Sequence, residues 1–191
     1  MTSVDVQQLG VLSELFAEAI AFRQPASIAI LGIAGGNGLN RIDSKMTCRV
    51  VGLDVNPLYL DAVRSRFPHL SGLELHCINL AEHVVELQPV ELVHTALVFE
   101  HAGTDLCLNN AVSLVANKGA LSIVLQLPAG AGQNVGRTGF ASIQRLASHF
   151  SLIDPMQLSE TLAERSLQLV FESRRSLPAD KEFWMGIFVR K

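Results

Sequence analysis

The sequence has few charged residues and few cysteines, and both shortages narrow the kinds of protein that it can encode. Only 17% of the 191 residues are charged and the formal net charge is −3, so no basic surface is expected to hold a nucleic-acid backbone. The three cysteines are widely separated and form no Cys-x-x-Cys pair, and the six histidines show no zinc-ligand spacing. The composition therefore predicts no nucleic-acid partner, no disulfide framework and no metal site.

The signals of secretion and membrane insertion are also missing. The first 24 residues include the acids Asp5 and Glu14 and have no basic start, unlike a signal peptide. Two long uncharged windows, 24–40 and 119–136, are interrupted by prolines and glycines and do not resemble membrane spans. These absences predict a cytoplasmic protein that makes no membrane contact.

Apolar residues are abundant instead, and their pattern predicts one α/β domain over residues 1–191. They make up 49% of the chain, and short continuous runs of them alternate with segments of helical spacing. Continuous apolar runs are typical of parallel strands that are covered on both faces. The predicted strands are 28–31, 49–54, 73–78, 91–98 and 120–127, and the predicted helices are 4–22, 38–45, one that Asn56 and Pro57 begin, and one that Thr104 and Asp105 begin, with a helix or turn at 80–88.

The end of the chain has a different pattern. Residues 166–175 and 182–191 alternate with a period of two, and the six residues between them are too few for a parallel crossover. A terminal antiparallel hairpin is therefore predicted beside the parallel sheet. Between sheet and hairpin, a glycine-rich loop is expected at 128–139 and a helix at 138–150.

Four glycines lie within the seven residues 32-GIAGGNG-38, directly after the first predicted strand. Ligands of open parallel sheets bind beyond the carboxyl ends of the strands, and Asp54 ends the second strand at that same edge. A carboxylate there can accept hydrogen bonds from both hydroxyls of a ribose. The pair predicts a nucleoside site, whereas the simpler alternative is a tight turn next to a solvated strand end.

A nicotinamide dinucleotide fits this loop poorly. The Gly-x-Gly-x-x-Gly pattern started at Gly32 would need glycine at Ala34 and Asn37. A Tyr-x-x-x-Lys pair for proton transfer is also missing, since Val63 stands four residues after the single tyrosine, Tyr59. A nucleotide-dependent oxidoreductase is therefore the third of three hypotheses.

The run 34-AGGNG-38 meets the Gly-x-Gly-x-Gly pattern with one change, and here the chain resembles the class I S-adenosylmethionine-dependent methyltransferases. The resemblance extends over 27–191 and includes Asp54, Asn79 after the third strand, the run 97-LVFEHAG-103 and the terminal hairpin. It implies a three-layer Rossmann-like fold with a seven-stranded, mostly parallel sheet and a C-terminal antiparallel hairpin. The implied cofactor is S-adenosyl-L-methionine, and the implied activity is methyl transfer.

By this resemblance the glycine loop lies along the cofactor, Asp54 binds its ribose and Asn79 lies at its adenine. Asn79 replaces the usual Asp, and Gly32 stands where the family usually has an acid that holds the charged methionine end. The implied cofactor-binding residues are Gly32, Ala34, Gly35, Gly36, Asn37, Gly38, Asp54, Val55, Asn56, Asn79, Leu80 and Val98.

Glu100 and His101 follow the fourth strand and are expected near the transferred methyl group. His101 is the preferred candidate for a base or an acceptor-orienting group, because an imidazole titrates near neutral pH. The alternative is that this pair caps the next helix or packs near the cofactor. His94 lies within the fourth strand and is predicted to be a core histidine.

The acceptor is constrained only in class. No Asn-Pro-Pro-Tyr sequence follows the fourth strand, where Val98 and Phe99 stand, so a small-molecule acceptor is preferred to a base nitrogen. The N-terminal helix within 1–24 fits three roles: a lid, a part of the core that 27–191 forms, or a contact in a homodimer.

The second hypothesis for the function is a non-catalytic S-adenosylmethionine-binding or regulatory protein.

Overall fold

The computed structural model describes residues 4–127, 151–178 and 181–191, which form one sheet with helices on both of its faces. The strands are β1 (Ser27–Leu31), β2 (Arg49–Asp54), β3 (Leu73–Cys77), β4 (Val90–Ala96), β5 (Val115–Leu127), β6 (Leu167–Leu177) and β7 (Lys181–Arg190). The helices are α1 (Val4–Arg23), the short 3₁₀ helix η1 (Leu39–Arg41), α2 (Pro57–Arg66), α3 (Phe99–Ala102), α4 (Leu106–Ser113) and α6 (Pro155–Glu164).

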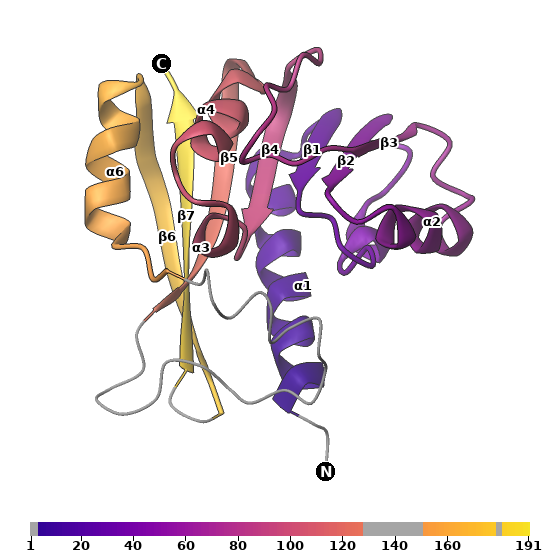
Figure 1. Ribbon diagram of the computed structural model, residues 1–191, viewed down its shortest axis with the longest axis horizontal. Helices are drawn as coiled ribbons and strands as arrows, with labels where there is room; N and C mark the ends of the chain where they lie inside the picture. The colour runs from indigo at the N-terminus through magenta and orange to yellow at the C-terminus, as the bar shows by residue number, and fades with distance from the viewer. Residues whose placement is uncertain (1–3, 128–150, 179–180) are drawn as a thin grey trace.

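The strands form a seven-stranded sheet in the order β3-β2-β1-β4-β5-β7-β6. Neighbouring strands from β3 to β5 are parallel, and β7 runs antiparallel to both β5 and β6. Figure 1 shows the long β6–β7 hairpin at one end of the sheet and β3 at the other. The predicted parallel sheet and its terminal antiparallel hairpin are therefore confirmed.

Alternate strand residues enter two separate cores, one on each face of the sheet. In β1, Ile28 and Ile30 pack with residues of α1 and α2, whereas Ala29 and Leu31 pack with residues of α3, α4 and α6. Because both faces are covered, the strand shows no polar alternation, which explains the continuous apolar runs of the sequence. The result is the predicted three-layer arrangement.

Local sequence signals placed several elements correctly. The β2 bounds match the prediction, and α2 begins at Pro57, where the Asn56 side chain accepts a hydrogen bond from the Leu58 N–H at 3.0 Å. The helix α6 went unpredicted although it has the same signal, since Asp154 caps it through the Met156 N–H at 2.8 Å and Pro155 is its first residue.

The helix expected over 38–45 and the start of the fifth strand differ from the structure, whereas 80–88 contains turns, in agreement with the helix or turn predicted there. The segment 38–45 contains only the single 3₁₀ turn η1. The helix α4 ends at Ser113 and β5 begins at Val115, five residues before the predicted start at 120, because the Val90 N–H pairs with Leu114 O and extends the ladder backwards. The loop predicted at 128–139 and the helix predicted at 138–150 lie outside the described residues.

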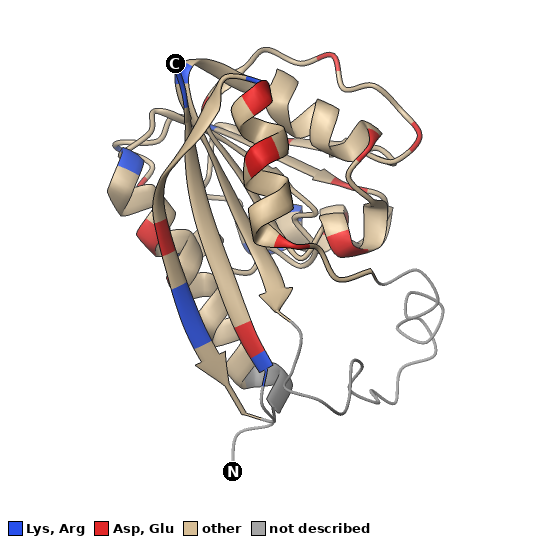
Figure 2. Ribbon diagram, turned by 90° about the vertical axis from the view of Figure 1, so that its left-hand side faces the viewer, with Lys and Arg blue, Asp and Glu red and all other residues tan. Residues whose placement is uncertain are grey.

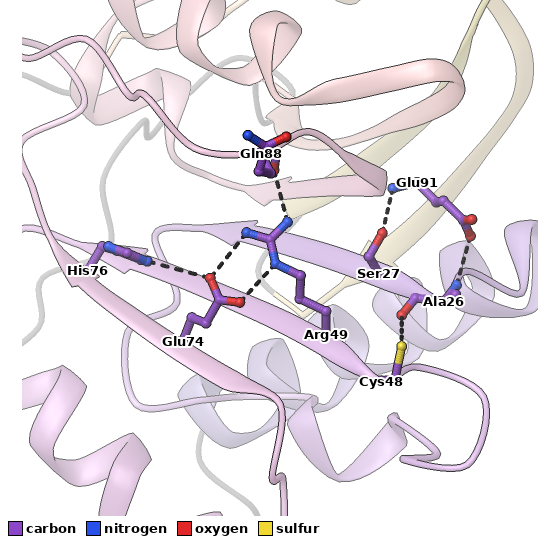
Figure 3. Close-up of polar contacts among 8 residues, drawn as sticks. All are labelled: Ala26, Ser27, Cys48, Arg49, Glu74, His76, Gln88 and Glu91. Atoms are coloured by element: carbon purple, nitrogen blue, oxygen red, sulfur yellow. Dashed lines mark hydrogen bonds and ion pairs between the residues drawn. The ribbon is translucent and has the colours of Figure 1, made fainter.

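A polar network holds the edge of the sheet where the parallel strands begin (Figure 3). Arg49 donates to Glu74 Oε1 at 2.8 Å and to Gln88 O at 2.9 Å, and the hydrogen bond from Arg49 lowers the pKa of Glu74. On the neighbouring pair of strands, the Glu91 N–H donates to Ser27 Oγ at 3.1 Å. These contacts fix the strand starts, at the end opposite to the glycine loop.

The two arginines of β6 are paired with acids. Arg175 contacts Glu18 of α1 at 2.9 Å and Arg174 contacts Glu182 of β7 at 3.7 Å. Figure 2 shows basic and acidic segments interspersed along this hairpin.

Over 4–127, 151–178 and 181–191, no helix has the length and hydropathy of a bilayer span. The same ranges contain no group of three or more His, Cys, Asp and Glu side chains placed to hold a metal ion.

Candidate cofactor site

The glycine loop turns sharply after β1 and packs tightly against α2. Gly36 has a φ of +79°, and a Cβ placed on it would lie 2.7 Å from Phe67 Cε2. Only glycine fits there, since a side chain would meet both a strained backbone and an aromatic ring. The guanidinium of Arg66, in the last turn of α2, donates to Gly35 O across the loop. The loop backbone is therefore held in one conformation at the carboxyl end of the sheet.

Asp54 joins this loop to the end of β2. It is 8% exposed, its Oδ2 accepts a hydrogen bond from the Ala34 N–H at 2.8 Å, and its Oδ1 accepts one from the Asn56 N–H at 2.9 Å. Each carboxylate oxygen can accept two hydrogen bonds, so among the described residues each keeps one acceptor position. Two vacant positions on one rigid carboxylate suit a pair of neighbouring hydroxyls, such as those of a ribose.

The residue after β1 faces the residue that follows β4. Gly32 has a φ of +69°, and a Cβ placed on it would lie 2.6 Å from Val98 Cγ2. Carbon atoms that are not linked through bonds do not approach so closely, which means that Val98 occupies the space a side chain at position 32 would need. The sequence alone could not show this contact, because 66 positions separate the two residues.

The N-terminal helix is attached to the far end of the glycine loop. Asn37 Nδ2 donates to Leu9 O at 2.9 Å, and the next residue, Gly38, faces Phe16 with room for no Cβ, at 2.9 Å from Phe16 Cδ1. Arg41 Nε also donates to Ser13 Oγ at 3.1 Å. The Asn37 side chain therefore anchors α1 through its amide nitrogen.

The adenine-side residues of the prediction lie beside Asp54. The Ile78 N–H donates to Asp54 O at 2.9 Å, which brings the end of β3 to this site, and Asn79 Oδ1 accepts from the Ala81 N–H at 3.1 Å. Leu80 is buried, and its carbonyl accepts from Asn110 Nδ2 at 3.0 Å. Val55, in contrast, is 62% exposed, so it presents an apolar surface at the mouth of the site.

Glu100 is the most unusual ionisable group at this edge of the sheet. It is 1% exposed, its Oε1 accepts from the Gln126 N–H at 2.8 Å, and its Oε2 has no hydrogen-bond partner within the described part of the chain. Burial raises the pKa of Glu100 to about 7, so the carboxyl titrates near neutral pH. A buried group that changes charge in this range is a candidate for proton transfer.

His101 follows Glu100 and lies on the exposed side of α3. Partial burial lowers its pKa below the ordinary value, which favours the neutral ring at pH 7. The prediction for His94 is confirmed: it is buried, Nδ1 lies 3.1 Å from Ser122 Oγ, and burial lowers its pKa to about 3. The structure therefore separates a core histidine from an accessible one.

Several solved structures share the fold of this chain. The N-methyltransferase NodS from Bradyrhizobium japonicum WM9, in complex with S-adenosyl-L-homocysteine, superposes with a TM-score of 0.71 at 14% identity, over 99% of this chain and 88% of that one. Magnesium protoporphyrin IX methyltransferase (ChlM) from Synechocystis PCC 6803, also with that ligand bound, gives 0.71 at 10% identity, over 98% and 85%. The chain has the class I methyltransferase fold.

A third structure shows that this methyltransferase fold also carries other chemistry. The [4+2]-cyclase SpnF superposes with a TM-score of 0.71 at 12% identity, over 94% of this chain and 79% of that one. No family model matches the sequence, and no curated protein matches it either. At these identities the likeness establishes the fold, and the function has to be argued from the site.

Sequence reasoning did not identify the structural roles of three residues at the candidate site. Glu100 was recognised, but its burial, which sets its pKa, depends on β5 and cannot be seen in the sequence. Arg66 and Asn110 reach the site from other elements, Arg66 through the Gly35 carbonyl and Asn110 through the Leu80 carbonyl. Neither has a local sequence signal, because each makes its contact only after folding.

Proposed function

We propose that this protein transfers a methyl group from S-adenosyl-L-methionine to a small-molecule acceptor. The observation that carries the proposal is Asp54, a buried carboxylate that is fixed against the glycine loop and keeps one acceptor position on each oxygen. Neighbouring ribose hydroxyls satisfy both positions. The exposed Val55 next to it offers apolar contact for an adenine ring.

The residues at the end of β4 supply the acceptor side of the reaction. The cofactor provides a sulfonium methyl group with a good leaving group, so alignment of the acceptor accounts for much of the acceleration. Where the acceptor must lose a proton, Glu100 and the neutral His101 are the two candidates to receive it. Both belong to α3, which is only four residues long and directly follows the strand.

Calorimetry with S-adenosyl-L-homocysteine, the demethylated product, tests cofactor binding. Asp54→Ala should weaken binding by about 1.5–3 kcal/mol, the range for a hydrogen bond to a charged group. Asp61→Ala is the matched control, because Asp61 is an exposed acid of α2 that pairs with Arg64. No binding of this ligand to the wild-type protein would refute the proposal.

A second ligand separates ribose recognition from loop damage, since Asp54 also holds two backbone N–H groups. The 2′-deoxy form of the ligand should bind the wild-type protein about tenfold more weakly, as expected for one lost hydrogen bond to a carboxylate. Asp54→Ala should be nearly insensitive to the same change. Equal sensitivity of both proteins would remove the ribose assignment.

The second candidate function is a non-catalytic binding or regulatory protein. It is favoured by Gly32, which stands where the resembled family has an acid, and by the cyclase that shares the fold. Single-turnover assays with labelled cofactor and a panel of amines, phenols and carboxylic acids distinguish the two.

A homodimer formed through α1 also stays a prediction. Leu9 and Phe22 of this helix are about half exposed, and the molecular mass of the protein in solution tests whether they lie in a dimer contact.

A further inference from the structure

The contact between Gly32 and Val98 lies at the point where the sheet changes direction. From β1 the chain proceeds outwards to β2 and β3, whereas from β4 it proceeds the other way to β5. In such sheets the crevice between the two diverging strands receives the ligand. Gly32 follows β1 and Val98 follows β4 within two residues, so their contact lies in this crevice.

Two independent features disfavour a side chain at position 32. The backbone φ of +69° is strained for any residue other than glycine, and the Cβ position lies 2.6 Å from Val98 Cγ2. The aliphatic side chain of Val98, two residues after β4, occupies the space next to Gly32, so this part of the site is apolar.

The described carboxylates next to this crevice are held on either side of it. Asp54 is bonded to two N–H groups on the β2 side, and Glu100 is bonded to the Gln126 N–H on the β5 side. Because Glu100 is two residues after Val98 in a helical turn, the two side chains point in nearly opposite directions. The segment 128–150, which follows β5 in the sequence, contains no Asp or Glu.

We infer that this protein recognises its cofactor through the adenosine and sulfur half, and that Val98 replaces the carboxylate–ammonium pair at the methionine end with an apolar contact. The inference rests on the proposed function and extends its ligand class from S-adenosyl-L-methionine to 5′-thioadenosines in general. A ligand that lacks the amino-acid end therefore binds nearly as well as one that has it.

The test compares two ligands on the wild-type protein by calorimetry: S-adenosyl-L-homocysteine and 5′-methylthioadenosine, which has no amino-acid end. A hydrogen-bonded charge pair changes affinity by about ten- to hundredfold, so a site without one should bind both ligands within about fivefold. If S-adenosyl-L-homocysteine binds more than about fivefold tighter, the inference is wrong while the proposed function stands. If neither ligand binds, both are overturned.

A variant restores the missing charge without touching the strained glycine. Val98→Asp places a carboxylate where the Val98 methyl group meets the Gly32 position, and Val98→Asn is the neutral control of the same shape. The Asp variant should favour S-adenosyl-L-homocysteine over 5′-methylthioadenosine by about tenfold more than the Asn variant does. An equal ratio in the two variants would contradict the inference, and should neither fold, the wild-type comparison decides.

Glu100→Gln tests whether Glu100, rather than a residue at position 98, supplies a carboxylate to the ammonium group of the ligand. If the wild-type protein discriminates strongly between the two ligands and this variant does not, then Glu100 holds the ammonium group and the apolar assignment of the crevice is refuted. If the affinity ratio is close to one in both proteins, the methionine end has no carboxylate partner at either position, as inferred.

Discussion

The buried Glu100 should make the protein less stable as the pH rises through neutrality, and Glu100→Gln should abolish this dependence. Burial raises the pKa of the carboxyl from 4.5 to about 7, so between these values the folded protein binds the proton more readily than the unfolded chain does. A group with a raised pKa contributes stability that is fully present below 4.5 and lost as the pH rises through about 7. Its loss corresponds to about 3 kcal/mol of unfolding free energy.

The substitution also changes the packing, but that effect does not depend on pH. The amide oxygen of Gln can still accept from the Gln126 N–H, whereas its NH₂ group takes the place of an oxygen that has no partner among the described residues. Such a buried donor costs about 1–3 kcal/mol at every pH. The informative quantity is therefore the difference between wild-type and variant stability as a function of pH, in which any constant term disappears.

Urea unfolding at pH 5, 6, 7 and 8 measures this difference, with fluorescence as the probe. Trp184 is the one tryptophan of the sequence and is 1% exposed, so its emission reports loss of the core. The stability difference should fall by about 1.4 kcal/mol for each pH unit up to about 7 and then level off. Glu160→Gln, at an exposed position of α6, is the matched control. Parallel pH profiles for wild type and Glu100→Gln would refute the argument that burial controls this carboxyl.

Two further predictions concern the folded core. Gly36→Ala should cost about 2 kcal/mol or more in urea unfolding, because it adds a Cβ at a φ of +79° and 2.7 Å from Phe67, while Gly10→Ala in the open interior of α1 should stabilise by about 0.5–1 kcal/mol. Equal effects at the two glycines would contradict the packing described for the loop. Burial lowers the pKa of His94 from 6.5 to about 3, so the buried neutral ring contributes stability that is present above pH 6.5 and is lost as the pH falls towards 3. The difference in unfolding free energy between wild type and His94→Gln should therefore decrease by about 1.4 kcal/mol per pH unit in that range. A difference that does not change during acid unfolding would show that His94 is not buried as the neutral ring.

Much of the fold was predictable because its signals are local. A strand covered on both faces needs a continuous apolar run, and a helix start needs a cap and tolerates proline, so β2 and the start of α2 were correctly placed. The 3₁₀ turn η1 was mistaken for a longer helix. Gly38, which precedes this turn, packs against Phe16 of α1. The local sequence could not predict this contact, because the two residues come from different elements.

Some features of the candidate site were also predictable from local sequence, and others were not. The spacing from the glycines to Asp54 predicted a nucleoside loop, and the structure brings Asp54 to 2.8 Å from the Ala34 N–H. The site assignments themselves, including a catalytic His101, stay predictions for the binding and turnover experiments. Glu100 could not be preferred on sequence grounds, since its pKa depends on burial against the end of β5.

The sequence by itself determined the sheet class, the terminal hairpin and the edge of the sheet at which the glycine loop lies, because periodicity, turn residues and glycine spacing act over a few residues at a time. The tertiary structure decided what surrounds that edge. Gly32 and Val98 follow two strands, β1 and β4, that are adjacent in the sheet and far apart in the chain, and Glu100 of α3 is bonded to Gln126 of β5. Burial, close packing and the electrostatics that follow from them are properties of such non-local neighbours, and no single segment of the sequence contains them.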